Sequence, residues 1–271
     1  MCFLGNGNDV AELGMKKPNL ATDVKMVLMI GSAPDALLAK NWDLSLFTHR
    51  VAINNAWQIT SEWDYLVYPE DFASERLPSM LLKPHQQLIA APEFVPQQNS
   101  FGGFVYAGGT MAFTAGYWAL GALKPDIMVF LGCDMVYGAI TGQSSHFYGH
   151  GSPDPLRDDV TLQSLEAKSV RFMSLAHKHN CAVLNLSELP ESRLLFPRVS
   201  RQELAEPSVR HNIVDQQFEL LNTDRIARAL NAEKDLGYMV QSGRYWEHTA
   251  EFDKAKLSAI DDLWLQAIQA A

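Results

Sequence analysis

The sequence predicts an α/β fold: a Rossmann-like parallel sheet with helices on both faces, followed by a C-terminal helical extension. Short apolar runs alternate with helix-like stretches between residues 25 and 187, and this alternation is typical of parallel sheets. The clearest run is apolar at every position, as expected for a strand that is covered on both faces. Small, polar and acidic residues follow several runs, and ligands bind at the carboxyl ends of the strands in such sheets.

Each expected strand is a short apolar run, and each expected helix has a recognisable boundary or period. Residues 110–123 are expected to form a helix that ends at Lys124-Pro125, because proline disfavours helix at the residue before it. Residues 160–179 place apolar side chains close to a helical period, and GSAPDAL (31–37) is expected to turn into a helix. The expected strands are KMVLMI (25–30), VAIN (51–54), YLVY (65–68), LIAAPEF (88–94), DIMVFLG (126–132) and CAVLNLS (181–187).

The chain divides into three expected segments. Residues 1–22 have the composition of a loosely structured N-terminal arm. Residues 23–190 are expected to form a nucleotide-binding α/β domain with a short lid loop at 135–157. Beyond residue 190, prolines and arginines lead into polar helical stretches, so residues 191–271 are expected to form the C-terminal helical extension.

Composition excludes several classes of protein. The formal net charge is −9, which argues against a nucleic-acid-binding protein because such proteins normally carry a basic face. The three cysteines form no CxxC pair, so no zinc site or disulfide framework is predicted. No apolar run approaches the roughly 20 residues of a membrane span, and the first residues lack a signal-peptide pattern. We expect a cytoplasmic protein with at most peripheral membrane association. The sequence leaves open whether the protein forms a homo-oligomer.

Three short motifs at the expected strand ends are candidates for binding a nucleotide. GSAPD (31–35) offers backbone N–H groups at a helix start, which suits a phosphate, although a plain turn explains it equally well. Asn54 and Asn55 carry both donors and acceptors for a nucleobase or sugar, although asparagine is also common in turns. Asp134 follows an apolar strand at Gly132-Cys133 and is either a functional carboxylate or a helix cap.

The stretch SSHFYGH (144–150) is a candidate reacting loop. His146 and His150 are four residues apart, but Gly149 and Gly151 argue against the helix on which such a pair binds zinc best. Imidazole titrates near neutral pH, so a histidine here suits a general base that deprotonates a hydroxyl. The chain has no Asp-x-Asp pair to hold a metal ion against a diphosphate. A donor with one phosphate needs only neutral hydrogen-bond donors.

These motifs, in this order, resemble those of the bacterial sialyltransferases of glycosyltransferase family 42, over about 160 residues. IGSAPDAL (30–37) is similar to the family's Gly-Asn-Gly-Pro-Ser-Leu turn, and INNAW (53–57) to its Cys-Asn-Gln-Phe segment. GGTMAFTAGYWALG (108–121) resembles its Thr-Ser-Gly turn and helix. FLGCDMVYG (130–138) resembles its Ser-Gly-Ile-Asp-Phe-Tyr, and SHFYGH (145–150) its Ser-His-Tyr-Ile-Gly-His.

The resemblance implies an inverting transfer of sialic acid or a related sugar from a CMP-sugar donor to a glycan hydroxyl, with no metal or other cofactor required. It implies that His150 is the general base and that tyrosine hydroxyls, with Tyr137 and Tyr148 as candidates, support the departing phosphate. His146 is a secondary candidate. The implied nucleotide-binding residues are Gly31, Ser32, Ala33, Asn54, Asn55, Gly108, Gly109, Thr110, Gly132 and Asp134.

The sequence also departs from the family pattern. The segment from Asp134 to His150 is shorter than the family's lid, Ser32 replaces an asparagine, and Gly109 replaces a serine. Pro69-Glu70 stands where the family has another nucleotide-binding asparagine. Two alternatives therefore stay open: a pterin diphosphokinase-like pyrophosphoryl transferase that depends on Mg²⁺, and a nucleotide-binding protein without catalysis.

Overall fold

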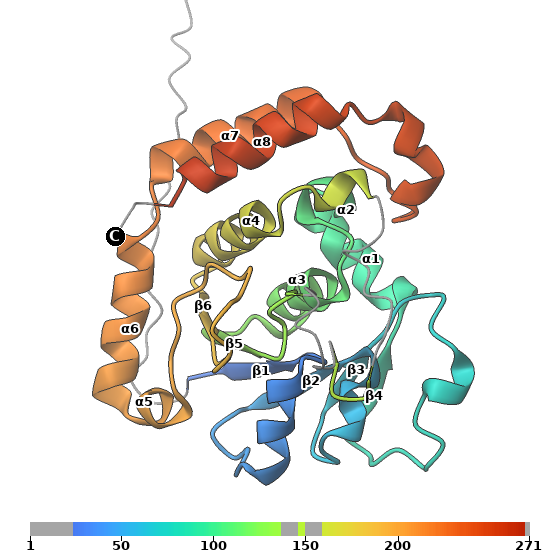
Figure 1. Ribbon diagram of the computed structural model, residues 1–271, viewed down its shortest axis with the longest axis vertical. Coiled ribbons are helices and arrows are strands. Elements are labelled where there is room, and N and C mark those ends of the chain that lie inside the picture. The colour runs from blue at the N-terminus through green and yellow to red at the C-terminus, as the bar shows by residue number, and fades with distance from the viewer. Residues whose placement is uncertain (1–23, 137–145, 150–158, 269–271) are drawn as a thin grey trace, which may run out of the picture.

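The computed structural model describes residues 24–136, 146–149 and 159–268 (Figure 1). Within them, six strands form one sheet in the order β4-β3-β2-β1-β5-β6, and all neighbouring strands are parallel. The predicted α/β fold class is therefore confirmed. The expected N-terminal arm and most of the expected lid loop lie outside the described residues. The strands are β1 (Met26–Ile30), β2 (His49–Ile53), β3 (Tyr65–Val67), β4 (Gln87–Ile89), β5 (Ile127–Leu131) and β6 (Ala182–Asn185).

The central strands are buried on both faces, which explains their uninterrupted apolar sequences. In β1, Val27 and Met29 face one hydrophobic cluster, whereas Leu28 and Ile30 face a second cluster on the other side of the sheet. Successive side chains of a strand point to opposite faces. Leu28 pairs in register with residues of both β2 and β5, so β1 lies at the centre of the sheet.

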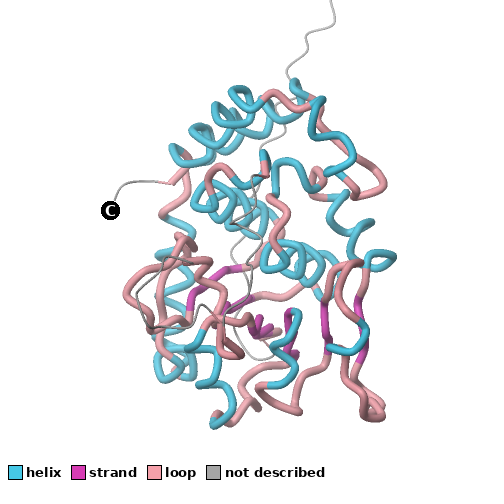
Figure 2. The backbone as a smooth tube through the Cα atoms, turned by 45° about the vertical axis from the view of Figure 1, so that its right-hand side comes forward, coloured by secondary structure: helices cyan, strands magenta, loops and turns pink. Residues whose placement is uncertain are grey.

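Helices cover both faces of this sheet (Figure 1, Figure 2). One face carries α1 (Ala91–Ser100), α2 (Phe104–Ala107), α3 (Met111–Leu123) and α4 (Leu165–Lys178). The other face carries the 3₁₀ helices η1 (Pro34–Asn41) and η2 (Asn54–Gln58), together with α5 (Arg201–Ala205) and α6 (Pro207–Glu219). Three further 3₁₀ segments are η3 (Ser74–Arg76), η5 (Val160–Leu162) and η6 (Tyr245–Glu251).

Two sequence predictions need correction at the level of single elements. The expected strand at 88–94 ends at Ile89, and α1 begins at Ala91. Pro92 stands in the first helical turn and the carboxylate of Glu93 accepts a hydrogen bond from Ala90 N at 3.0 Å, so this stretch is a helix start. The helix expected across 160–179 begins at Leu165, because Ser164 caps it and the preceding turn is the separate segment η5.

The helix predicted at 110–123 is confirmed as α3. Thr110 is its N-cap, and its side chain accepts a hydrogen bond from Phe113 N at 3.4 Å. At the other end Lys124 adopts a left-handed conformation, with a φ of 50°, and Pro125 follows it. Capping residues and the proline therefore set both ends of α3.

The C-terminal extension packs onto the α/β part of the chain. Helices α7 (Thr223–Leu236) and α8 (Lys254–Gln266) lie beside each other and cover α4 (Figure 1). Buried residues of both helices, including Ile226 and Trp264, belong to the same hydrophobic cluster as the strand residue Val27. The extension and the sheet therefore share one core.

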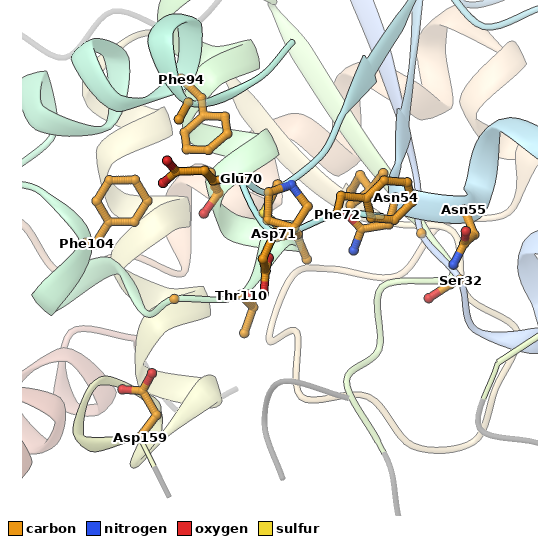
Figure 3. A pocket seen from close by; sticks show the side chains of 18 of the residues that line it. Ser32, Asn54, Asn55, Glu70, Asp71, Phe72, Phe94, Phe104, Thr110 and Asp159 are labelled. Carbon is orange, nitrogen blue, oxygen red and sulfur yellow. The ribbon is translucent and has the colours of Figure 1, made fainter. Parts of the chain in front are cut away.

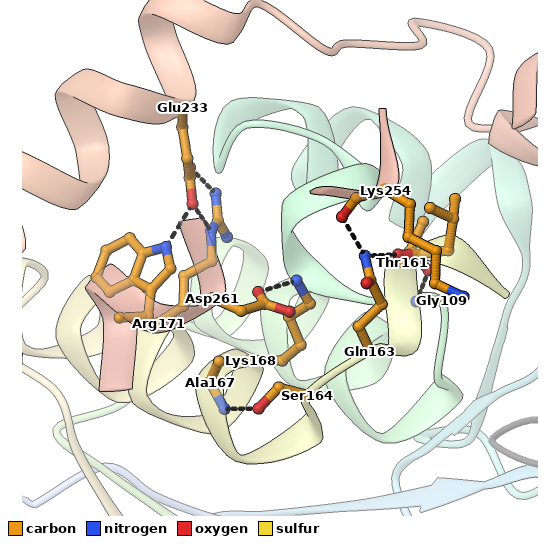
Figure 4. A network of polar contacts seen from close by, with 12 residues as sticks. Gly109, Thr161, Gln163, Ser164, Ala167, Lys168, Arg171, Glu233, Lys254 and Asp261 are labelled. Atoms are coloured by element: carbon orange, nitrogen blue, oxygen red, sulfur yellow. Dashed lines mark hydrogen bonds and ion pairs between the residues drawn. The ribbon is translucent and has the colours of Figure 1, made fainter. Parts of the chain in front are cut away.

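A set of buried charged residues, here called the polar seam, joins α4 to α7 and α8 (Figure 4). Arg171 donates to both carboxylate oxygens of Glu233, at 2.8 and 2.9 Å, and to the hydroxyl of Tyr117 at 2.7 Å. The indole N–H of Trp264 donates to the same carboxylate at 2.7 Å. Lys168 pairs with Asp261 at 2.5 Å. These bonds join the extension to α4, which itself packs on the sheet.

Candidate functional site

A cavity of about 850 Å³ opens at the carboxyl ends of β1, β2, β3 and β5 (Figure 3). Strand β1 has β2 on one side and β5 on the other, so the strand order reverses at this place. Ligands of open α/β sheets bind in the crevice at such a topological switch point. The cavity therefore lies where the strand order of this sheet predicts a ligand-binding site.

Two glycines allow the ends of β1 and β5 to approach closely. A Cβ atom added to Gly31 would lie 2.2 Å from the carbonyl oxygen of Gly132, and one added to Gly132 would lie 2.5 Å from the Cβ of Ala36. Gly132 also has a φ of 70°, in the left-handed region that favours glycine. Ala33 N donates to Gly132 O at 2.9 Å. The cavity floor is therefore bare backbone at this point.

Asn54 has an unusual backbone and an unsatisfied side chain. Its φ is 54°, a left-handed conformation that costs free energy in residues other than glycine and is concentrated at functional sites. Its buried side-chain oxygen has no hydrogen-bond partner, and leaving such a group unpaired costs about 1–3 kcal/mol. Both Asn54 and Asn55 line the cavity. A ligand that donates to this oxygen would remove the penalty.

Two carboxyl groups lie close to the same strand ends. Asp134, which follows β5, is 1% exposed, and both of its carboxyl oxygens are unpaired in the structure. Asp35 lies near Ser187, Glu188 and Asp134. Burial raises the pKa of Asp35, hydrogen bonds from Ser187 and Glu188 oppose this shift, and the nearby charge of Asp134 adds to it. Only the Asp134 oxygens resemble the Asn54 oxygen in being buried without a partner.

The C-terminal extension completes the cavity with a segment here called the C-terminal loop, residues 242–247. The hydroxyl of Tyr245 donates to Asp159 Oδ2 at 2.8 Å, and its ring stacks on Phe104 with 6.1 Å between ring centres. A Cβ atom at Gly109 would lie 1.8 Å from the Tyr245 hydroxyl, so only glycine permits this contact. Arg244 pairs with Glu70 beyond β3 at 2.6 Å.

The described part of the predicted reacting loop, residues 146–149, also borders the cavity. His146 is 7% exposed, exchanges backbone hydrogen bonds with Gly149 at 3.2 and 3.0 Å, and stacks on the ring of Tyr148. Phe147 N donates to Ser32 O at 2.9 Å, which ties this loop to the turn after β1. Burial lowers the pKa of His146. His150 and Tyr137 lie outside the described residues.

The structure brings most of the predicted nucleotide-binding residues together. Gly108 and Asp134 are not among the residues that line the cavity: Gly108 lies against Lys168 and Leu162, and Asp134 is enclosed behind its neighbours. The predicted residues that do line it are Gly31, Ser32, Ala33, Asn54, Asn55, Gly109, Thr110, Gly132, His146 and Tyr148.

Sequence reasoning missed the aromatic and C-terminal walls of the cavity. Phe94 and Phe104 come from α1 and α2, which had no predicted role, and Tyr245 and Trp246 come from the extension. The one local signal was the stretch SGRYWE (242–247), in which a glycine and two neighbouring aromatics interrupt polar helical sequence.

Three findings bear on what the protein binds and resembles. Among those residues, no group of three or more histidine, cysteine, aspartate or glutamate side chains is arranged to hold a metal ion. None of the helices in the described part of the chain has the length and apolarity to cross a membrane. Comparison of the chain with models of protein families, with curated proteins and with solved structures finds no match. The geometry of the cavity and the motifs of the sequence are therefore the grounds for a functional proposal.

Proposed function

We propose that the protein is a glycosyltransferase that moves sialic acid or a related sugar from a CMP-sugar donor to a glycan hydroxyl. One observation carries this proposal: the sequence motifs that resemble the sialyltransferase pattern meet around a single cavity at the switch point of the sheet. Sheet order alone brings the strand-end motifs together, so the added support comes from Gly109, Thr110, His146 and Tyr148, which belong to other segments and line the same cavity. The cavity volume of about 850 Å³ falls in the range of small-molecule sites.

The strand-end wall of the cavity suits a nucleoside monophosphate. Ser32, Asn54 and Thr110 offer neutral hydrogen-bonding groups, and Arg76 adds one positive charge. A phosphodiester-like group with a single negative charge is stabilised by such groups without a bound cation. The bare backbone at Gly31 and Gly132 leaves space for close approach of the nucleotide.

The transfer itself needs a base and a leaving-group donor. The acceptor oxygen forms a bond to the anomeric carbon while the bond from that carbon to the phosphate oxygen breaks, and CMP leaves with the electron pair. The acceptor proton passes to a histidine, which the resemblance assigns to His150. His146 lies at the cavity and its lowered pKa keeps the imidazole neutral at pH 7, the form that accepts a proton.

Nucleotide-dependent thermal stability tests the proposal. A ligand that binds only the folded state raises its apparent stability, so we expect CMP to raise the Tm more than UDP or GDP, with EDTA present. Turnover of a CMP-sugar is then measured by release of CMP. Preference for a diphosphate, or no turnover of any CMP-sugar, would contradict the transferase proposal. Binding of CMP without turnover would favour a non-catalytic nucleotide-binding protein.

A second candidate, Mg²⁺-dependent pyrophosphoryl transfer, is favoured by the two unpaired carboxyl oxygens of Asp134, which lie directly behind the residues that line the cavity at the end of β5. Magnesium is commonly held by one or two carboxylates together with substrate phosphates. This candidate expects stabilisation by ATP that disappears on addition of EDTA. The same thermal-shift series therefore separates the two functions.

A further inference from the structure

A chain of hydrogen bonds runs from the C-terminal loop to the turn that precedes α3. The hydroxyl of Tyr245 donates to Asp159 Oδ2 at 2.8 Å. The other carboxylate oxygen, Oδ1, accepts from the backbone N–H and from the hydroxyl of Thr161, both at 2.7 Å. The hydroxyl oxygen of Thr161 in turn accepts from Gly109 N at 3.3 Å (Figure 4). Three segments that are distant in sequence therefore meet through one carboxylate.

The last member of this chain of bonds belongs to the cavity wall. Gly109, Thr110 and Met111 line the cavity, and Thr110 caps α3. The first backbone N–H groups of an α-helix have no partner inside the helix, so their direction depends on how the turn before the helix is held. Thr161 is fully buried and bonds to this turn from the protein interior. The position of the Gly109–Thr110 turn therefore depends on residues outside α3.

Close packing holds the first member, Tyr245, in place. Its ring is buried and stacks on Phe104 with 6.1 Å between ring centres. A Cβ atom added to Gly109 would lie 1.8 Å from the Tyr245 hydroxyl, and one added to Gly243 would lie 2.8 Å from the side chain of Val95. The loop that carries Tyr245 is thus packed against α1 and α2, and its hydroxyl has a defined position.

We propose that Tyr245 is a positioning residue for the ligand site: its hydroxyl, acting through Asp159 and Thr161, sets the position of the Gly109–Thr110 turn. The assignment of CMP as the ligand rests on the proposed function, in which this turn contacts the nucleotide. Loss of the Tyr245 hydroxyl then weakens CMP binding although the hydroxyl bonds to Asp159 and not to the nucleotide. The C-terminal extension therefore contributes to binding by orienting another segment of the cavity wall.

Two substitutions break the chain of bonds at different places, and each has a matched control. Tyr245→Phe removes the first hydroxyl. Its control is Tyr238→Phe, because Tyr238 belongs to the same extension, its hydroxyl accepts from Asp253 N at 3.0 Å, and it does not line the cavity. Thr161→Val removes the second hydroxyl, whereas Thr161→Ser keeps it.

Amide hydrogen exchange at residues 108–112 reports on the turn without any ligand. We expect faster exchange there in Tyr245→Phe and Thr161→Val, and the parent rate in Tyr238→Phe and Thr161→Ser. CMP affinity, measured by isothermal titration, should fall about three- to tenfold in the first two variants, the loss expected from one hydrogen bond. Because both substitutions break one chain of bonds, the double variant should lose little more than either single variant.

Exchange at the parent rate in Tyr245→Phe, or an equal change in Tyr238→Phe, would overturn the positioning role. Weaker CMP binding with unchanged exchange would mean that Tyr245 contacts the ligand directly, which also contradicts it. If Tyr245→Phe does not fold, the two Thr161 variants give the answer, since only Thr161→Val should alter the turn. A parent protein that does not bind CMP would contradict the proposed function, while the exchange rates still decide the positioning role.

Discussion

The Arg171–Glu233 part of the polar seam and the strand ends at the cavity both enclose polar groups, but only in the first are these groups fully hydrogen-bonded. In the seam, both carboxylate oxygens of Glu233 and all three guanidinium nitrogens of Arg171 make hydrogen bonds. At the strand ends, the side-chain oxygens of Asn54 and Asp134 are buried and unpaired. Satisfied buried groups hold a structure together, whereas an unsatisfied one costs free energy until a ligand pairs with it. The contrast distinguishes buried groups that stabilise the fold from the Asn54 oxygen, which lies at the cavity and is a candidate to pair with a ligand.

The largest expected effect is a loss of stability when the Arg171–Glu233 pair of the polar seam is removed. Arg171→Met should lower the free energy of unfolding by about 3–5 kcal/mol, because it leaves the buried carboxylate of Glu233 without its cation. Urea denaturation measures the loss. The double variant Arg171→Met, Glu233→Leu serves as the control and should recover part of the stability, since neither charge then remains. A single variant as stable as the parent would show that the seam contributes nothing to the fold.

The next effect concerns chemistry rather than stability. His150→Ala should lower kcat by about 10²–10⁴-fold, the typical contribution of a general base, while CMP affinity hardly changes. His146→Ala should cost less and should act through loop order, because His146 is buried, stacks on Tyr148 and bridges to Gly149. CMP release from a CMP-sugar and a nucleotide titration are measured for both variants. Greater damage in His146→Ala would reverse the assignment.

A smaller effect tests the unpaired oxygen at the strand ends. Asn54→Ala should weaken nucleotide binding by about 1–3 kcal/mol, because the ligand loses its hydrogen-bond partner. Isothermal titration with CMP measures the change. Asn54→Gly separates the side chain from the backbone, since glycine adopts the φ of 54° without strain. If the glycine variant binds CMP as well as the parent protein, the Asn54 side chain has no part in the site.

The smallest effect is a gain in stability. Burial raises the pKa of Asp35, so the folded state holds this proton more tightly than the unfolded state does. Burial of the ionised Asp35 therefore costs no stability below the ordinary pKa of 3.8. The cost grows as pH rises from there to the raised pKa of the folded state. Asp35→Asn should raise the free energy of unfolding at neutral pH by less than about 1 kcal/mol, because solvent screens a half-buried group, and should have no benefit in acid. Thermal unfolding at both pH values measures the gain. A gain that is independent of pH would exclude this cause.

The sheet and the strand-end wall of the cavity were predictable because their signals are local. Apolar runs identified β1 and β5, and their last residues lead directly into Gly31 and Gly132 at the cavity floor. The parallel order then places those ends together. Apolar residues alone were misleading at 88–94, where they suggested a strand. Pro92 and Glu93 are the residues that indicate the start of a helix there.

The wall that the C-terminal loop adds to the cavity was not predictable, because its parts meet only through the tertiary fold. Glu70 and Arg244 are separated by 174 positions in the chain, and Tyr245 reaches Asp159 across 86. No periodicity or spacing in the sequence links such residues. Their meeting depends on how α7 and α8 dock against the rest of the chain, through a shared hydrophobic cluster and through buried pairs such as Lys168 with Asp261.

The position of the C-terminal loop in the chain has a consequence for synthesis on the ribosome. Domains form from the N-terminus as the chain emerges, and all six strands precede residue 186. Glu233 and the C-terminal loop are made later, so a nascent chain that has completed its sheet still has an unpaired guanidinium at Arg171 and a cavity with one wall missing. The candidate site is therefore completed only after residues 242–247 have been made.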